Sequence, residues 1–256
     1  MMPVIDGHIH IEKQDYSLEL IENMERIALQ KHIDELYVLD HTHKFKEFNF
    51  LYDNITEEIT KEHFKKVGRM SVKEYLDFIS LVKSKTWKVK FRFGLEVCFF
   101  KESYDELKEV LNKLPRFDFL IGSIHFVSGA GVDISRDIYL KVDVDEFYRQ
   151  YFKDLDFMIK TKMFTFIAHP DLFKLFGVFP SFNLEPYYEN LAKTLKEYNQ
   201  ETENNSGLVR YGYPYPGLSD ELIKTFLKYD VKFHKSSDAH KYEDIGRCFN
   251  EITENR

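Results

Sequence analysis

Short apolar segments alternate with longer amphipathic segments along most of this chain. Each short segment holds a few consecutive apolar residues and ends in polar ones, as buried strands do. Each longer segment repeats its apolar residues every three or four positions, as helices do. Strands are therefore expected at residues 4–10, 35–39, 88–95, 117–124, 165–168, 203–206 and 231–236.

Capping signals mark several of the expected helices. Ser71 and Ser103 are each followed three residues later by glutamate, the pattern of a capping box. Helices are expected to begin near residues 17, 71, 103, 145, 186 and 219. Residues 45–70 are polar and irregular, which predicts an insertion near the mouth of the structure, and residues 128–131 are expected to form a flexible loop.

The alternation of about seven strands with helices, without an internal linker, indicates a parallel sheet. A length of 256 residues is normal for a single α/β barrel. If the first and last strands lie close together, the sheet closes into a barrel. We therefore expect one domain, residues 1–256, of the α/β class.

Composition and charge exclude several kinds of partner. The net charge is −7 and no long block of Lys or Arg occurs, so a nucleic-acid interface is not expected. No apolar stretch is long enough to span a bilayer, and no signal peptide is evident, so a cytoplasmic protein is expected. Cys98 and Cys248 lie far apart in the sequence, and we interpret them as reduced thiols.

Metal-ligand side chains gather at the ends of the expected strands. His8 and His10 are two residues apart, so in a strand both imidazoles point to one face. In a parallel barrel all strand ends of this kind meet on the face that carries the active site. The residues at these ends are His8, His10, His41, Glu96, His125, His169, Asp238 and His240.

This set is too large for one tetrahedral zinc ion, which takes three protein ligands and a water. Two or three divalent ions explain it better, and Glu96 and Asp238 could each bridge two ions because a carboxylate has two oxygens. Histidine and carboxylate ligands accept zinc, manganese or iron.

Several ordered motifs carry a family resemblance. They are Asp6-Gly7-His8-Ile9-His10, Asp40-His41, Gly94-Leu95-Glu96-Val97, Ser123-Ile124-His125-Phe126, Ala168-His169-Pro170-Asp171 and Ser237-Asp238-Ala239-His240. The chain resembles the polymerase and histidinol phosphatase (PHP) family. The segments 205–210, 213–216 and 244–247 resemble its histidinol-phosphate phosphatase subgroup.

The resemblance implies a distorted (β/α)7 TIM-like barrel with a three-metal site. It implies a first metal held by His8, His10, Glu96 and Asp238, a second held by Glu96, His125 and His169, and a third held by His41, His240 and a residue soon after His10. Relatives often place a histidine at that last position. This chain lacks one there, and we expect Asp15 to take its place, with Glu12 as the alternative.

The resemblance also implies hydrolysis of a small phosphomonoester, L-histidinol phosphate, by a hydroxide that bridges two metals. Glu96, Asp238 and His240 are the expected catalytic residues. Arg210 and His43 are the expected substrate-binding residues. Arg210 is expected because a guanidinium can donate two hydrogen bonds to one phosphate group. The oligomeric state is left open.

Other functions stay open at this point. The same site could act on another phosphomonoester, such as phosphotyrosine or a nucleotide. An amidohydrolase barrel also begins with His-x-His, but it acts on carbonyl groups. A metal-binding regulatory protein without turnover is a third possibility. A comparison of p-nitrophenyl phosphate with amides and lactones as substrates would separate the two enzymatic classes.

Overall fold

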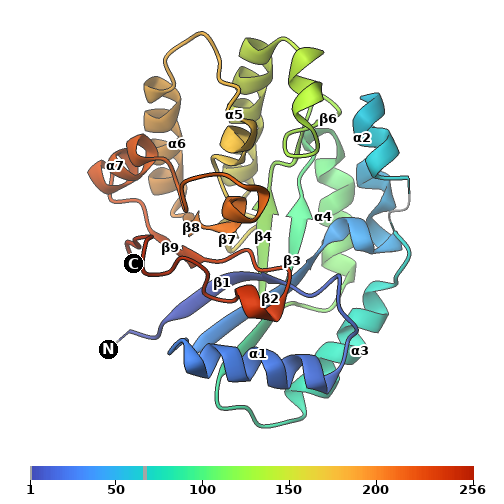
Figure 1. Cartoon of the computed structure of the whole chain (residues 1–256). Coiled ribbons are helices and arrows are strands. Elements are labelled where there is room, and N and C mark those ends of the chain that lie inside the picture. Colours follow the sequence, from blue (N-terminus) through green and yellow to red (C-terminus); the bar gives the residue numbers. More distant parts are fainter. Residues whose placement is uncertain (1, 66–67) are drawn as a thin grey trace.

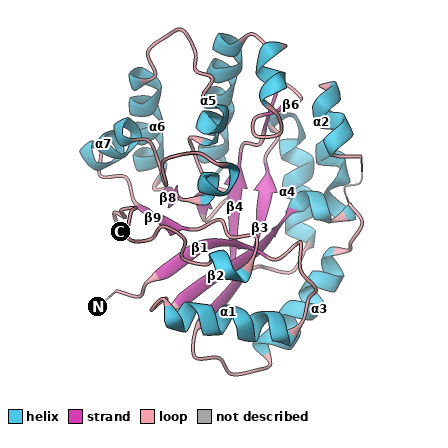
Figure 2. Ribbon diagram, viewed as in Figure 1, coloured by secondary structure: helices cyan, strands magenta, loops and turns pink. Residues whose placement is uncertain are grey.

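The computed structural model describes residues 2–65 and 68–256. Its main sheet has seven strands in the order β1-β2-β3-β4-β7-β8-β9, and every neighbouring pair is parallel (Figures 1 and 2). The strands are β1 (Ile5–His10), β2 (Glu35–His41), β3 (Lys90–Cys98), β4 (Phe119–Ser123), β7 (Phe166–Ile167), β8 (Glu201–Asn205) and β9 (Phe233–Ser236). The seven predicted strands are confirmed, with boundaries shifted by a few residues.

The sheet nearly closes on itself between β1 and the segment after β9. The backbone N–H of His10 donates to the carbonyl of Ala239 at 2.7 Å, and Ile9 forms a parallel bridge with Ala239. Gly7 permits this approach, because a Cβ there would overlap the side chain of His234. The seven-stranded barrel expected from the sequence is thus confirmed.

Seven α-helices lie outside this sheet in the described residues (Figure 2). They are α1 (Leu18–Gln30), α2 (Glu58–His63), α3 (Val72–Lys83), α4 (Tyr104–Lys113), α5 (Val144–Thr161), α6 (Glu185–Tyr198) and α7 (Asp220–Lys228). The capping box at Ser71 forms, whereas the one predicted at Ser103 does not. The Ser103 hydroxyl instead accepts a hydrogen bond from Asn54 Nδ2 at 2.7 Å. None of the described helices has the length and apolar character needed to cross a membrane.

The predicted insertion at 45–70 is largely helical where the structure describes it. It contains the 3-10 helix Lys46–Asn54 and α2, and residues 66–67 lie outside the described part. The segment 128–131, expected to be a flexible loop, belongs to a tight hairpin of β5 (Phe126–Val127) and β6 (Ala130–Gly131). The carbonyl of Gly129 accepts hydrogen bonds from the backbone N–H groups of Thr56 and Glu57, which ties the hairpin to the insertion.

The barrel interior is divided into an apolar part and a polar part. Leu39, Phe119, Ile121, Phe166 and Ala168 form a small buried apolar cluster, separate from the larger core that lies mainly between sheet and helices. Successive inward positions along a strand are two residues apart, so His41 follows Leu39 on the same face of β2. The apolar cluster therefore lies beneath the strand ends, where the polar residues gather.

Candidate metal centre

The predicted ligand residues meet at one end of the barrel. His8 and His10 lie on β1, His41 ends β2 and Glu96 lies on β3. The other four follow the ends of strands: His125 after β4, His169 after β7, and Asp238 and His240 after β9. Seven of the eight are buried, and His240 is partly exposed. Parallel pairing of the strands thus brings together residues from the whole length of the chain.

Glu96 lies at the middle of this group. Its two carboxylate oxygens lie 2.9 to 3.2 Å from imidazole nitrogens of His8, His10, His41, His125 and His169. Oε1 faces the nitrogens of His125 and His169, whereas Oε2 faces the other three. A carboxylate with partners on both oxygens has the geometry of a bridging ligand.

Within residues 2–65 and 68–256, three sets of ligand atoms lie close enough to hold a metal ion. They are His8, His10 and Asp238; His41, Glu96 and His125; and His10, Glu12, His41 and His240. His10 and His41 each belong to two sets, through opposite ring nitrogens. A neutral imidazole has a single lone pair for a metal, so each of these two histidines serves one ion at a time.

Glu12 occupies the position for which Asp15 was expected. One oxygen of Glu12 lies 2.7 Å from His41 Nδ1, and the other lies 3.6 Å from His240 Nε2. Asp15 is exposed and belongs to none of the sets formed by the described residues. β1 ends at His10, and Glu12 lies in the turn that the hydrogen bond from Gln14 N to Ile11 O closes. This turn brings the Glu12 carboxylate to within 3.5 Å of His10 Nδ1 and leaves Asp15 exposed.

Two buried or half-buried carboxylates that were not expected from the sequence orient ligand histidines. Glu203 on β8 accepts a hydrogen bond from His8 Nδ1 at 3.1 Å, and Asp133 accepts one from His125 Nδ1 at 3.2 Å. Because each carboxylate accepts a hydrogen bond from Nδ1, the lone pair of that histidine lies on Nε2, which points toward Glu96. Such partners fix the ring and increase its basicity as a ligand. Glu203 could have been found in the sequence as a glutamate within a predicted strand, at a position that faces the barrel interior.

Opposite charges stabilise one another in this centre despite burial. Burial alone would lower the pKa of His8, but the carboxylates of Glu203, Asp238 and Glu96 outweigh it and raise this pKa to about 10. Burial would likewise raise the pKa of Glu96, yet the surrounding imidazoles hold it well below its usual range. Divalent cations bind these groups in place of the protons, so metal affinity here depends on pH.

The donor set fits a divalent metal ion. Imidazole nitrogens and carboxylate oxygens converge, a combination that suits zinc, manganese or iron. His10 Nδ1 and His169 Nδ1 are buried and have no hydrogen-bond partner among the described residues. Buried polar atoms normally have partners, so these two nitrogens mark positions where coordination or a bound water is expected.

Comparison with known proteins identifies the family. Residues 6–209 match the sequence model of the PHP domain, which is most of the chain. The chain belongs to the PHP family. The resemblance noted in the sequence is thereby confirmed.

Individual relatives of this PHP domain agree with that assignment. A protein of Deinococcus radiodurans, named a probable histidinol-phosphatase, is 26% identical over 184 residues, which cover 69% of this chain and 68% of the relative. A crystal structure from Listeria monocytogenes, described as a candidate histidinol phosphatase (hisK), superposes with a TM-score of 0.77 at 19% identity and covers 97% of this chain and 100% of its own.

A second solved structure has the same fold. It is the histidinol phosphate phosphatase of Lactococcus lactis in complex with Zn, L-histidinol and phosphate. The TM-score is 0.67 at 16% identity, with coverage of 94% of this chain and 88% of the other. At such low identities, the two structures establish the barrel fold of this PHP domain.

Arg210 and His43 line a cavity of about 260 Å³ directly above the metal-ligand residues. Arg210 Nη1 donates a hydrogen bond to the carbonyl oxygen of Asp238 at 2.5 Å and lies 3.4 Å from its carboxylate. The ring of His43 stacks on His41 at 4.7 Å, and burial lowers its pKa to about 3. Both residues predicted to bind substrate thus lie at the mouth of the centre.

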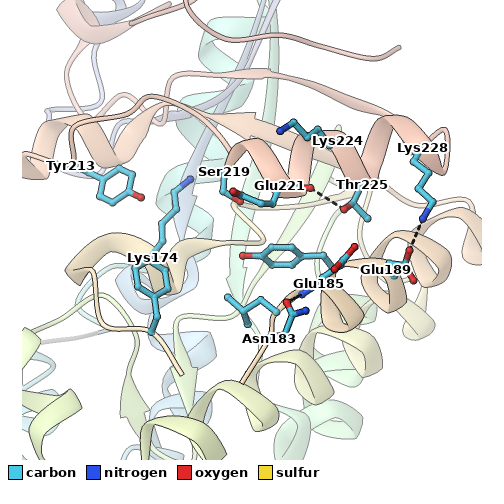
Figure 3. A pocket seen from close by; sticks show the side chains of 13 residues that line it. Lys174, Asn183, Glu185, Glu189, Tyr213, Ser219, Glu221, Lys224, Thr225 and Lys228 are labelled. Atoms are coloured by element: carbon cyan, nitrogen blue, oxygen red, sulfur yellow. Dashed lines mark hydrogen bonds and ion pairs between the residues drawn. The ribbon is translucent and has the colours of Figure 1, made fainter. Parts of the chain in front are cut away.

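A larger cavity of this PHP domain lies elsewhere. It has a volume of about 620 Å³ and lies between α6 and α7 (Figure 3). Among the described residues, its lining shares no member with the cavity above the metal-ligand residues. The amine of its buried Lys174 is already paired with Asp171 at 2.7 Å. Cavity size alone therefore does not locate the chemistry of this fold.

Proposed function

We propose that this PHP domain is a metal-dependent phosphomonoesterase that hydrolyses L-histidinol phosphate to L-histidinol and phosphate. The observation that carries the proposal is the environment of Glu96, which lies among five imidazoles beneath a small cavity with Arg210 at its rim. The names of the relatives support histidinol phosphate as the substrate.

Two or three divalent ions held by these ligands would supply an ionised water near neutral pH and positive charge for the phosphoryl oxygens. The chain contributes the geometry. In our proposal Glu96 would bind metal through both of its oxygens, and Glu12 would complete the ligand set of His41 and His240. The neutral His8, His10, His125 and His169 complete the coordination.

Arg210 is proposed to bind the phosphoryl group. Its guanidinium is directed into the centre by Asp238 and carries a positive charge at every working pH. A water held by His240, or Asp238 once it has taken up the proton that the attacking water releases, would give a proton to the leaving oxygen. His43 stays neutral in this environment and offers a polar surface to the organic part of the substrate.

The cavity above the metal-ligand residues continues into a second one. The first has a volume of about 260 Å³ and the second about 500 Å³. Both are lined by Glu12, Lys13, His43, His63 and Phe64. The choice of histidinol phosphate over a nucleotide therefore rests on the names of the relatives and not on volume.

A substrate panel with metal analysis tests the proposal. We expect two or three divalent ions per chain and a higher kcat/KM for L-histidinol phosphate than for phosphotyrosine, a nucleotide monophosphate or p-nitrophenyl phosphate. Glu96→Gln should lose metal and reduce kcat by orders of magnitude. Equal kcat/KM for all phosphomonoesters would refute the substrate, and preferred hydrolysis of an amide or lactone would refute the reaction.

A further inference from the structure

One wall of the cavity above the metal-ligand residues is aromatic. His43, His63, Phe64 and Phe126 contribute to its lining. His63 ends α2 and Phe64 follows it directly, so the insertion at 45–70 supplies two of these four side chains. This wall is distinct from the imidazoles and carboxylates beneath it.

The ring of Phe64 is held in one orientation by its neighbours. It stacks on Tyr52 with 5.7 Å between ring centroids and an interplanar angle of 11°. It makes edge contacts with Phe126 at 5.2 Å and with His43 at 5.5 Å. These contacts leave Phe64 half-buried, so part of the ring remains available to the cavity.

The backbone beneath Phe64 is also anchored. The Glu57 carboxylate caps α2 by accepting a hydrogen bond from Thr60 N at 2.8 Å. The buried Thr60 hydroxyl accepts a hydrogen bond from Gly131 N in the β5–β6 hairpin at 2.9 Å. Gly129 lies close to the insertion in a left-handed conformation, and a Cβ there would overlap Thr56. The wall therefore exists before any substrate binds.

We propose that Phe64 is a specificity-determining residue that selects phosphomonoesters whose alcohol carries a planar ring. This inference rests on the proposed function and adds to it the residue that recognises the organic part of the substrate. The phosphoryl group would lie at the metal-ligand residues and the ring against Phe64. Aromatic pairs favour offset or edge-to-face contacts, which a fixed ring offers at low entropic cost.

The imidazoles of His43 and His63 complement Phe64. Each lies beside its ring, at 5.5 Å and 5.0 Å respectively. They place hydrogen-bonding nitrogens at the edge of the aromatic surface. A planar ring that itself bears nitrogen atoms fits this arrangement better than a purely hydrocarbon ring.

Two substrates that differ in the ring separate recognition from chemistry. The first is L-histidinol phosphate, and the second is O-phosphoethanolamine, which has an amine and a phosphate but no ring. Phe64→Ala should lower the ratio of their kcat/KM values roughly tenfold, because an aromatic contact contributes about one factor of ten in affinity. The loss should appear in KM for L-histidinol phosphate, with kcat little changed.

Phe50→Ala is the matched control. Phe50 is a partly buried aromatic residue of the same insertion and does not line the cavity. It should leave the ratio unchanged. An equal fall of the ratio in both variants, or no fall in Phe64→Ala, would overturn the role of Phe64.

Binding of L-histidinol without turnover gives an independent measurement. Calorimetry with the metal-loaded protein should show roughly tenfold weaker binding to Phe64→Ala than to the unmodified chain. Equal affinity, or no binding to the unmodified chain, would overturn the inference. Failure of the unmodified chain to cleave any phosphomonoester would instead refute the proposed function, so the two failures are distinguishable.

Discussion

Glu203 accepts a hydrogen bond from Nδ1 of His8 at 3.1 Å inside the barrel, although 195 residues separate the two in sequence. The same carboxylate also accepts a hydrogen bond from the backbone N–H of His169 at 2.9 Å. One side chain of β8 thus positions two candidate ligands from different strands. A carboxylate can only accept here, so it fixes the tautomer in which His8 Nε2 carries the lone pair.

Glu203→Gln should weaken metal binding about 10- to 100-fold, because the amide removes the negative charge that orients His8 and increases its basicity. Competition with a chelator of known affinity measures this change. Glu201→Gln, at an exposed position of the same strand, is the control and should bind metal normally. Unchanged affinity in Glu203→Gln would contradict the positioning role.

Glu12 and Asp15 give a paired test of the candidate third metal set. Glu12→Gln should reduce the metal content by about one ion per chain, because Glu12 is the carboxylate beside His41 and His240. Asp15→Asn should retain the full content. Elemental analysis of both variants decides between them, and metal loss from Asp15→Asn alone would restore the original expectation.

The metal-ligand residues show which parts of the site the sequence predicts and which it does not. The period of a strand and the parallel sheet predict that residues such as His41 and Glu96 meet at one end of the barrel. Asp15 was preferred because it is an oxygen ligand just ahead of the first helix, with Glu12 as the alternative. The turn Ile11–Gln14, which brings Glu12 to His41 and His240, has no strong sequence signal.

Contacts between distant segments account for the other differences. Glu203 acts through His8, 195 residues away on β1, and no spacing within the chain reveals such a pair. Asp133 is only eight residues from His125, but the turn that brings them together follows from the β5–β6 hairpin. Ser103 has the pattern of a capping box, yet the insertion supplies Asn54 as a competing partner. The glycines of 128–131 indicated flexibility, whereas close packing against Thr56 requires one of them.

Asp154 should make the stability of the fold depend on pH. Burial raises its pKa from 3.8 to about 6, although Gln150 donates a hydrogen bond to it at 2.7 Å. The folded chain therefore keeps a proton that the unfolded chain releases at lower pH. The free energy of unfolding falls as pH rises between these two values and stays lower above them.

Asp154→Asn should remove this fall. Relative to the unmodified chain, the variant should gain about 1–3 kcal/mol in the free energy of unfolding near pH 7 and nothing near pH 4. Urea denaturation at both pH values measures the difference. Glu106→Gln, at an exposed position on α4, serves as the control. A gain of equal size at both pH values would show that burial of the charge is not the cause.

Arg210 provides the sharpest test of phosphate recognition. Arg210→Ala should lower kcat/KM for the phosphomonoester by about 10²–10³, because a positive donor aimed at the phosphoryl oxygens is lost. Arg210→Lys should recover only part of this loss, since a lysine cannot bind in two places at once. Arg247→Ala is the control, because Arg247 pairs with Asp244 and does not line the cavity.

Metal content separates this role from an indirect one. Arg210 also contacts Asp238 and His240, so its loss could act by disturbing candidate ligands. If Arg210 binds phosphate, the alanine variant keeps its metal and binds inorganic phosphate more weakly. A parallel loss of metal and activity would instead make Arg210 a residue that positions Asp238, and its assignment to the substrate would be wrong.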